Sequence, residues 1–272
     1  MQHFSISPLA LVRSLRQNRG LIGALVRREI VGRYRGSVLG LVWSFVNPVL
    51  LLAVYTFVFS EVFKARWSGG VGSKTEFAIV LFSGLVIFNL FAECFNRAPA
   101  LVLSNVNYVK KVVFPLEILP VVALGAALFH LLVSALVWFL FFVLFMGMPP
   151  MTALLLPVAI IPLLMLSLGV GWFMASLGVY LRDIAQFTGI VTTVLMFMSP
   201  IFYPVTMLPK DYQYVMLLNP LTPVIEQARE VMIWGRMPDW TLLGGYTAAM
   251  LVMAWLGFAW FQKTRKGFAD VL

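Results

Sequence analysis

Long apolar stretches, separated by short polar ones, dominate the sequence. A helix needs roughly 20 apolar residues to cross a hydrocarbon core of about 30 Å. Six stretches come close to or exceed this requirement: residues 38–60, 77–95, 118–146, 151–180, 187–205 and 241–262. The pattern therefore predicts an all-α integral membrane protein with six transmembrane helices.

Composition points to the same class. Of the 272 residues, 61% are hydrophobic and 11% are charged, which leaves too little polar surface to cover a water-soluble globule. The first residues lack the order of a cleavable signal peptide, because their arginines continue beyond the first apolar positions, so we expect them to be retained. We expect one transmembrane domain over residues 1–272, with an interface segment at 1–37, the six-span bundle at 38–262 and a tail at 263–272.

Positive charges are distributed unevenly among the segments that join the spans. An even number of crossings places both termini on one side of the membrane. The basic residues on that side are fourteen of twenty: Arg13, Arg16, Arg19, Arg27, Arg28, Arg33, Arg35, Arg97, Lys110, Lys111, Arg182, Lys263, Arg265 and Lys266. By the positive-inside rule the termini are cytoplasmic, and the formal charge of +9 needs no nucleic-acid partner to explain it.

The segment before the first span predicts a helix that lies in the membrane interface. Its apolar residues fall near one helical face, away from Arg27, Arg28 and Glu29: Leu21, Ile22, Leu25, Val26 and Ile30. Arg33 and Arg35 follow, and no charge occurs from there to Pro48. Two roles are compatible with this pattern, an anchor that sets the topology and a surface on which another protein docks.

Residues 97–120 join the second and third spans on the basic side. Pro99 can open a helix there, and Val102, Val106 and Val109 form an apolar stripe. The polar surface of this helix is supplied by Ser104, Asn105, Asn107 and Tyr108. We expect a cytoplasmic helix that presents a surface, and the simpler alternative is a connector between two spans.

Residues 199–240 do not fit a simple bundle. Apolar positions at helical spacing predict a helix over residues 223–234, which at 1.5 Å per residue is only about 18 Å long and cannot span a membrane. It carries Glu226, Arg229 and Glu230, and each charge at mid-membrane costs on the order of 3 kcal/mol. Two interpretations remain, a hairpin that dips part-way into the membrane from outside and an amphipathic helix on the outer surface.

Small residues within the spans permit close approach of helices. Gly36 and Gly40 lie at the start of the first span, and Gly169, Gly171 and Gly178 lie in the fourth. We expect them to serve helix packing within the subunit.

The sequence carries little catalytic or metal-binding chemistry. The single cysteine, Cys94, excludes an intramolecular disulfide and a thiolate cluster. The string SGGVGSKT at residues 68–75 fails the spacing of a phosphate-binding loop, because Ser73 separates Gly72 from Lys74. His130, alone in the third span, is expected to make an interhelical hydrogen bond. We therefore expect no metal site and no catalytic site.

Five motifs occur in order along the chain: RYRGSVLGLVWSFVNP at 33–48, VKKVVFPLEILP at 109–120, YLRDIAQ at 180–186, SPIFYP at 199–204 and NPLTPVIEQARE at 219–230. Together they resemble the membrane subunit of ABC-2 type transporters that export bacterial O-antigen, capsule and wall teichoic acid. The resemblance covers nearly the whole chain.

The resemblance implies a homodimer in the bacterial inner membrane, with a channel between the two copies. Each copy would rest on a separate cytoplasmic ATPase subunit, which binds ATP and Mg, so no cofactor is expected in this chain. The substrate would be a lipid-linked polysaccharide, most simply O-antigen. Residues 99–110 would be the coupling helix, with contacts to the ATPase from Val102, Ser104, Asn105, Val106, Asn107 and Tyr108, and residues 201–234 would be re-entrant helices at the outer exit.

Aromatic side chains are candidates for the channel because sugars stack on aromatic faces. The candidate channel residues are Trp43, Tyr55, Phe59 and Phe197, and the candidate exit gate is Phe202, Tyr203, Glu226, Arg229 and Glu230. Packing, or an aromatic belt at the membrane interface, is the alternative.

Two other protein classes remain as alternatives. An integral-membrane glycosyltransferase or lipid-modifying enzyme needs an acidic or histidine-bearing active site, and the aspartates are scattered without metal-binding spacing. A secondary transporter needs ionisable groups inside the membrane, and His130 is the candidate.

Overall fold

The computed structural model describes residues 5–62, 67, 74–110 and 114–272. All regular secondary structure in these ranges is helical. Five stretches are long and apolar enough to cross a membrane: Gly40–Phe59, Thr75–Arg97, Leu116–Met146, Met151–Tyr180 and Trp240–Val271. They coincide with five of the six predicted spans, which confirms an all-α protein of the membrane class. The predictions for Lys111 and for residues 68–73 lie outside the described residues.

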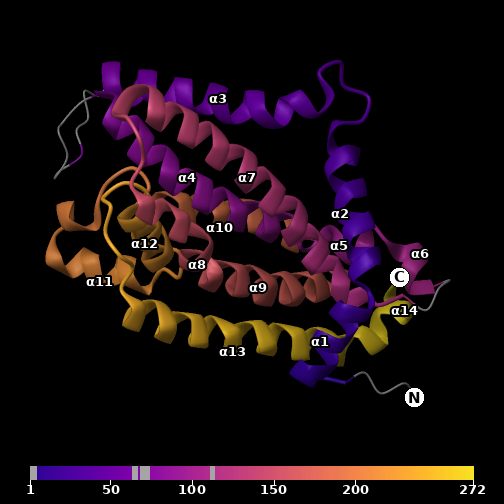
Figure 1. The fold of residues 1–272 in the computed structure, drawn as a ribbon. Coiled ribbons are helices and arrows are strands. Elements are labelled where there is room, and N and C mark those ends of the chain that lie inside the picture. Colours follow the sequence, from indigo (N-terminus) through magenta and orange to yellow (C-terminus); the bar gives the residue numbers. More distant parts are fainter. Residues whose placement is uncertain (1–4, 63–66, 68–73, 111–113) are drawn as a thin grey trace.

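The chain is a succession of long helices joined by short ones (Figure 1). The longer helices are α2 (Arg19–Tyr34), α3 (Trp43–Thr56), α4 (Lys74–Arg97), α7 (Leu119–Met146), α9 (Ile161–Tyr180), α10 (Ile184–Phe197) and α13 (Trp240–Thr264). The shorter ones are α1 (Pro8–Gln17), α5 (Ala100–Leu103), α6 (Val106–Lys110), α8 (Leu156–Ala159), α11 (Lys210–Leu218), α12 (Thr222–Met232) and α14 (Phe268–Val271). Single turns extend or join them: η1 (Gly40–Val42), η2 (Phe57–Val62), η3 (Leu116–Ile118), η4 (Met151–Leu155), η5 (Val205–Met207) and η6 (Arg265–Gly267).

The fifth predicted span is shorter than expected. Helix α10 ends at Phe197 rather than at residue 205, and its 14 residues are about 21 Å long. The chain turns after Phe197, and the side-chain amide of Asn219 donates to the carbonyl of Met198 and to the hydroxyl of Ser199, both at 2.9 Å. Pro200 and Pro204 follow, and proline cannot donate a helical hydrogen bond. The sequence pattern therefore overestimated this helix at its C-terminal end.

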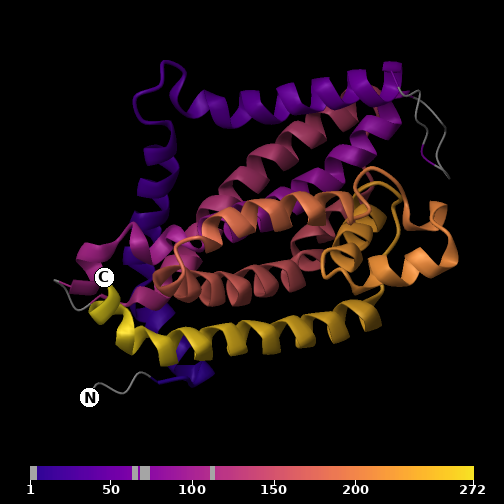
Figure 2. The ribbon, with the colours of Figure 1, turned by 180° about the vertical axis from the view of Figure 1, so that it is seen from behind.

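Helix α4 is the centre of the bundle, whereas α3 lies along its edge (Figures 1 and 2). In the most apolar part of the stretch that contains α4, 83% of the residues are buried. The corresponding fraction for the stretch that contains α3 is 6%. Leu50, Leu51, Val54 and Phe57 are all exposed on the α3 stretch. The first span therefore presents a broad apolar face to whatever surrounds the subunit.

Helices α9 and α13 approach closely through glycine. A Cβ atom added at Gly169 would lie 2.7 Å from the carbonyl oxygen of Met253, and one at Gly257 would lie 2.0 Å from the carbonyl oxygen of Gly169. Gly178 approaches Pro99 in the same way. The prediction that small residues of the fourth span serve packing within the subunit is confirmed at Gly169 and Gly178.

Gly36 and Gly40 have a different role from the one expected. Within the part of the chain that the structure describes, a Cβ atom at either position would meet nothing within 4 Å, so no helix of this subunit packs closely against them. Their φ angles are 87° and 52°, a left-handed conformation that glycine adopts without steric cost. They form the bend at which the chain leaves α2 and turns into α3 (Figure 1). Among the described residues, the prediction that these two glycines serve helix packing within the subunit is therefore wrong.

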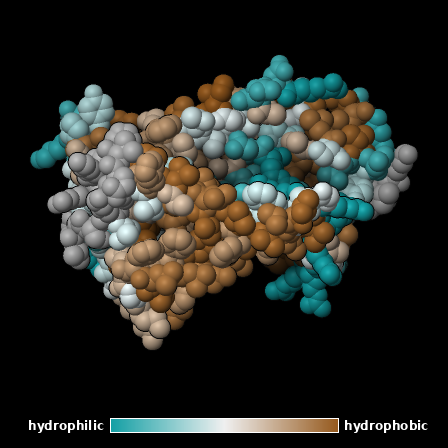
Figure 3. All heavy atoms as spheres, turned by 90° about the horizontal axis from the view of Figure 1, so that it is seen from above, coloured by the Kyte–Doolittle hydropathy of each residue, from teal (hydrophilic) through white to brown (hydrophobic). Residues whose placement is uncertain are grey.

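The first described residues and the C-terminus lie at the same end of the bundle, together with α1, α5, α6 and α14 (Figures 1 and 2). We call this the terminal end, and the opposite end, which carries α11 and α12, the distal end. Hydrophilic side chains gather over the terminal end, and apolar ones cover much of the middle of the face shown in Figure 3. A separate core holds the terminal end together, and it includes Leu25, Val102, Phe114, Trp172, Phe258 and Phe268. Because Phe268 is fully buried, the segment predicted as a tail is packed into the protein.

The short helix predicted over residues 223–234 is α12. Its residues Val224, Ile225, Ala228 and Val231 are buried in the main core, against α4 and α8. Most of this helix is therefore covered by protein.

Candidate functional site

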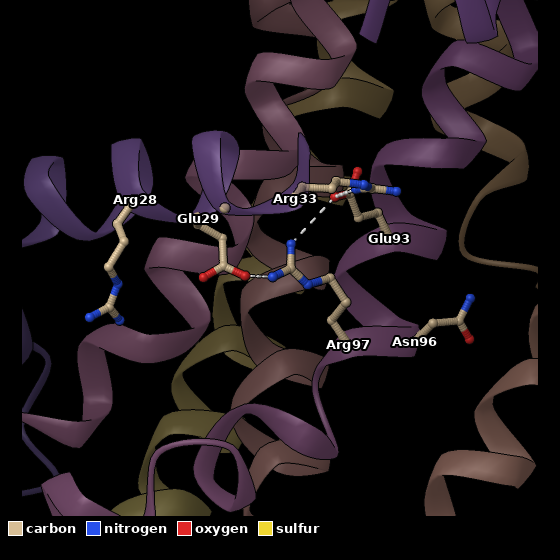
Figure 4. Close-up of a pocket in the computed structure, with 7 residues that line it drawn as sticks. Arg28, Glu29, Arg33, Glu93, Asn96 and Arg97 are labelled. Atoms are coloured by element: carbon tan, nitrogen blue, oxygen red, sulfur yellow. Dashed lines mark hydrogen bonds and ion pairs between the residues drawn. The ribbon is translucent and has the colours of Figure 1, made fainter. Parts of the chain in front are cut away.

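A polar cavity opens between α2 and α4 near the terminal end (Figure 4). Its volume is about 710 Å³, and its lining residues are Arg28, Glu29, Gly32, Arg33, Glu93, Asn96 and Arg97. On each helix these positions are three or four residues apart or adjacent, so each helix turns one polar face into the cavity. The arginine-rich stretch of α2 thus meets a polar face of the second span.

Ion pairs join the two walls of the cavity. Arg33 Nη1 lies 2.5 Å from Glu93 Oε1, and Arg97 pairs with Glu29 across the cavity and with Glu93 at 3.5 Å (Figure 4). Arg28 donates to the hydroxyl of Tyr108 at 2.9 Å. Three guanidinium groups therefore face two carboxylates, which leaves the lining with an excess positive charge.

Glu93 is also joined to the third span. A carboxylate oxygen lies 2.8 Å from His130 Nδ1, and His130 Nε2 lies 3.2 Å from the hydroxyl of Tyr34. The prediction that His130 makes an interhelical hydrogen bond is confirmed. Sequence reasoning missed Glu93, although a carboxylate within the predicted span 77–95 was a sufficient signal.

A second cavity, of about 260 Å³, continues from the first into the level of the spans. The two cavities share Arg33, Glu93 and Asn96, and we call them together the polar groove. The additional polar residues that line it come from α2, α3, α4 and α7: Tyr34, Ser44, Asn47, Asn89, His130 and Ser134. Such amide and hydroxyl groups both donate and accept hydrogen bonds, so the groove can bind a polyhydroxylated ligand without burying unpaired charge.

The groove is connected to α10 as well. The hydroxyl oxygen of Thr192 lies 2.9 Å from Asn96 Oδ1 and 2.8 Å from the carbonyl oxygen of Thr188, so its one proton is shared between these two acceptors. Asn47, Asn89 and Asn96 were not singled out from the sequence, because isolated amides in apolar stretches reveal a shared groove only when the helices are placed together.

The predicted coupling segment forms two short helices, α5 and α6, with a turn at Ser104 and Asn105. The side-chain amide of Asn105 donates to the carbonyl of Leu101 at 2.8 Å. Ser104 and Asn107 are exposed, and Val106 and Tyr108 are half-buried. Val102 is fully buried in the core of the terminal end, so it supports the segment from inside.

The four arginines predicted for the interface segment differ in their contacts. Arg28 and Arg33 hold α2 to Tyr108 and Glu93, as described above. All four arginines are exposed, and the contacts to other elements come from Arg28 and Arg33. Among the residues that the structure describes, only half of this set therefore ties α2 to other elements.

Three of the four predicted channel aromatics lie together near the distal end. Phe202 stacks on Phe59 and on Phe197, each at 5.6 Å between ring centroids, and lies 6.4 Å from Tyr55. We call these four residues the aromatic cluster. Trp43 is at the opposite end of α3 and does not join it. The hydroxyl of Tyr203 donates to the carbonyl of Phe197 at 2.7 Å, which fixes the turn that carries Phe202.

Arg229 is buried at the distal end, where it donates hydrogen bonds to backbone carbonyls, and it does not face an open channel. Its side chain is 2% exposed, and its Nη2 and Nε donate to the carbonyls of Ile201 at 2.9 Å and Val80 at 3.3 Å. It also donates to the carbonyl of Pro200 and lies 4.6 Å from the ring centroid of Trp67. Burial lowers the pKa of Arg229 to about 10. Because this value is still well above 7, the guanidinium remains charged at neutral pH.

Glu226 and Glu230, the other charged residues predicted for the exit gate, are less enclosed. Glu226 is 3.4 Å from Arg229, and Glu230 is 3.5 Å from the exposed Arg236. Glu226 and Arg229 therefore form an ion pair within α12, and Glu230 pairs with a residue that follows this helix.

Within the described ranges, no three His, Cys, Asp or Glu side chains are grouped so that they could hold a metal ion.

Comparison with known proteins assigns the chain to a family. A model of the family described as "ABC-2 type transporter" matches residues 20–233. The O-antigen export system permease protein RfbA of Myxococcus xanthus is 26% identical over 264 residues, which cover 96% of this chain and 99% of that protein. A protein of the same name from Klebsiella pneumoniae is 24% identical over 93% of this chain and 95% of its own length.

The polysialic acid transport protein KpsM of Escherichia coli is 25% identical over 244 residues, which cover 89% of this chain and 92% of KpsM. The matches extend over nearly the full length of these relatives. The family model covers both the polar groove and the aromatic cluster, since both lie within residues 20–233. This chain belongs to the ABC-2 type transporter family.

Proposed function

We propose that this chain is the channel-forming permease subunit of an ATP-driven exporter of a lipid-linked polysaccharide, most simply an O-antigen. The observation that carries the proposal is the polar groove. Charged, amide and hydroxyl side chains follow α4 from the terminal end into the level of the apolar spans. Polar groups at that depth are costly unless they pair with one another or line a water-filled cavity, and such groups often mark the pathway of a polar substrate.

The chemistry of the groove fits a sugar chain. Its deeper part offers the amides of Asn47 and Asn89 and the hydroxyls of Ser44 and Ser134, which match the hydroxyl groups of a glycan. Its mouth carries three arginines, and guanidinium groups recognise phosphate oxygens by charge-assisted hydrogen bonds. A glycan attached to its lipid through a diphosphate would meet the arginines first and the amides afterwards. The printed names of the relatives support this substrate class.

In this proposal two copies form the passage where they meet. The largely exposed α3 and the exposed apolar residues of α10, including Phe187, Ile190 and Val194, supply surface for such an interface. The chain crosses the bacterial inner membrane six times, with α10 as a short crossing, and both termini are cytoplasmic. The hairpin that contains α11 and α12 dips into the membrane from the outside.

A separate ATPase subunit would dock on α5 and α6, where Ser104 and Asn107 are exposed beside the half-buried Val106 and Tyr108. ATP and Mg belong to that subunit, and this chain contributes no catalytic group. Because Tyr108 is bonded to Arg28, movement of α6 would reach α2 and the mouth of the groove directly.

The test is transport by the reconstituted complex. The chain is co-expressed with the ATPase encoded beside it, and inside-out vesicles are supplied with lipid-linked glycan and ATP. We expect glycan in the vesicle lumen only when both subunits and hydrolysable ATP are present. An ATPase without its phosphate-binding lysine is the control.

Two results would contradict the proposal. Modification of the glycan or its lipid by this chain alone would indicate a membrane enzyme. Glycan accumulation driven by an ion gradient without the ATPase would indicate a secondary transporter.

A further inference from the structure

We propose that Glu117 and Arg265 form a positioning ion pair that transmits movement of α6 to α13, which makes the C-terminal segment part of the transport machinery. The inference rests on the proposed function, because it takes the ATPase to act on α5 and α6. It adds a second chain of contacts, which starts at the same docking segment and leads to α13 instead of to the polar groove.

The pair is enclosed and fully engaged. Arg265 Nη1 donates to Glu117 Oε2 at 2.6 Å, and the two side chains are 12% and 10% exposed. The other carboxylate oxygen accepts from the hydroxyl of Ser14 at 2.8 Å, and the carbonyl of Glu117 accepts from Trp172 Nε1 at 2.9 Å. One residue of η3 is therefore bonded to α1, α9 and η6 together.

A second contact leads from the pair to α6. Arg265 Nη2 donates to the carbonyl of Phe114 at 2.7 Å. The ring of Phe114 stacks on Tyr108 of α6, with 4.3 Å between the centroids and 14° between the planes. Displacement of α6 would therefore move Phe114, and with it the guanidinium that Phe114 holds.

Arg265, the second member of the pair, lies directly after the end of α13. Phe268, directly after η6, is fully buried and lies 5.4 Å from Phe261 between ring centroids. The hydroxyl of Tyr180 donates to the carbonyl of Thr264 at 2.8 Å. Figure 1 shows α14 beside α6 at the terminal end. The C-terminal segment thus connects α6, α9 and α13.

Stability alone is a weak reason for such a pair. Removing two charges from water costs much of what their attraction returns, and apolar replacements of similar volume are often neutral or stabilising. A pair of this kind does fix the relative orientation of the segments that carry it. The planar guanidinium can donate to the carboxylate and to the Phe114 carbonyl at the same time in only one arrangement. Glu117 lies in η3, which continues into α7, and Arg265 directly follows α13, so the pair joins two spans beside the docking segment.

The experiment uses the full chain in complex with its ATPase, reconstituted in vesicles. ATP hydrolysis and glycan delivery are measured together, and the readout is glycan delivered per ATP hydrolysed. The variants are Glu117→Gln, Arg265→Gln and the double variant. Lys266→Gln is the matched control, because it removes the same charge from the exposed neighbouring position.

We expect each single variant to lower glycan delivered per ATP by about threefold or more, the scale at which such networks modulate coupling. The double variant should be no worse than either single variant, since both act on one pair. Arg265→Lys keeps the charge but loses the planar geometry, so it should restore only part of the ratio. Lys266→Gln should match the unmodified complex.

An unchanged ratio in both single variants, with normal export by the unmodified complex, would overturn this inference alone. Loss of assembly with the ATPase in the double variant would also overturn it, because the pair would then serve folding. If the unmodified chain binds no ATPase, the proposed function fails and this inference fails with it.

Discussion

His130 Nδ1 lies 2.8 Å from a carboxylate oxygen of Glu93, so two ionisable side chains separated by 37 positions meet inside the helical bundle. Arg33 approaches the same carboxylate from α2. One carboxylate thus joins α2, α4 and α7. Its position at the junction of the two cavities makes it a structural requirement of the polar groove.

We expect Glu93→Ala to lower the stability of the subunit. The change leaves Arg33, Arg97 and His130 without their shared acceptor, and a partly enclosed network of this kind is worth about 1–2 kcal/mol. The melting temperature in detergent is the measurement. Arg27→Ala and Arg35→Ala are controls that should leave the melting temperature nearly unchanged. If Glu93→Ala unfolds at the same temperature as these controls, the network contributes nothing to stability.

Arg229→Ala should prevent stable folding of the distal end. It removes a buried cation whose hydrogen bonds hold the turn at Pro200 and Ile201 to α12 and α4, and it leaves those carbonyls unpaired. Loss of a buried, paired charge costs about 3–5 kcal/mol. The yield of monodisperse protein in size-exclusion chromatography measures the effect.

The matched control for that experiment is Arg236→Ala, whose side chain is 73% exposed. Equal yields for the two variants would contradict the role assigned to Arg229. Gly84→Ala should weaken the same site, because its Cβ would lie 2.6 Å from Arg229 Nη2.

Gly257→Val should separate α9 from α13. The new side chain meets the backbone of Gly169, which cannot move aside as a flexible side chain can, so the cost should reach or exceed the 1–3 kcal/mol usual for overpacking. Thermal unfolding in detergent is the measurement. Gly244→Val, where a Cβ meets nothing within 4 Å, is the control, and similar melting of both variants would refute the close approach.

Asn107→Glu should weaken binding of the ATPase without affecting the fold. The side chain is exposed on α6, whereas Asn105 donates to the carbonyl of Leu101 and its replacement would also disturb the turn. We expect affinity to fall by about tenfold, the effect of roughly 1.4 kcal/mol at an interface. Co-purification and a binding titration measure it. Lys210→Glu at the distal end is the control, and unchanged affinity for Asn107→Glu would remove α6 from the docking surface.

Phe202→Ala should change export and also lower the stability of the distal end. Phe202 stacks on both Phe59 and Phe197, and aromatic pairs contribute about 0.5–1.5 kcal/mol each beyond their burial. Its loss would loosen the aromatic cluster near the distal end and allow small polar dyes to leak through the complex. Dye leakage and glycan export in vesicles test this, and unaltered values in both assays would assign the cluster to packing.

Much of the architecture follows from local sequence. Five of the six predicted spans are present because an apolar run of about 20 residues has few other stable forms in a membrane. The apolar repeat around Ile225 and Ala228 correctly predicted the short α12. The motifs also led to the correct family, because they occur in order over residues 33–230, and the family model matches residues 20–233.

Tertiary structure decided which polar groups meet. Glu93 and His130 are 37 positions apart, and Arg265 and Glu117 are 148 apart, and neither separation follows a helical or strand period. The end of α10 at Phe197 depends on Asn219, which reaches back from the following segment. Hydrophobicity acts along the chain and can be read from it, whereas a hydrogen bond between spans depends on how helices are rotated and shifted against one another. That arrangement exists only when the helices have packed.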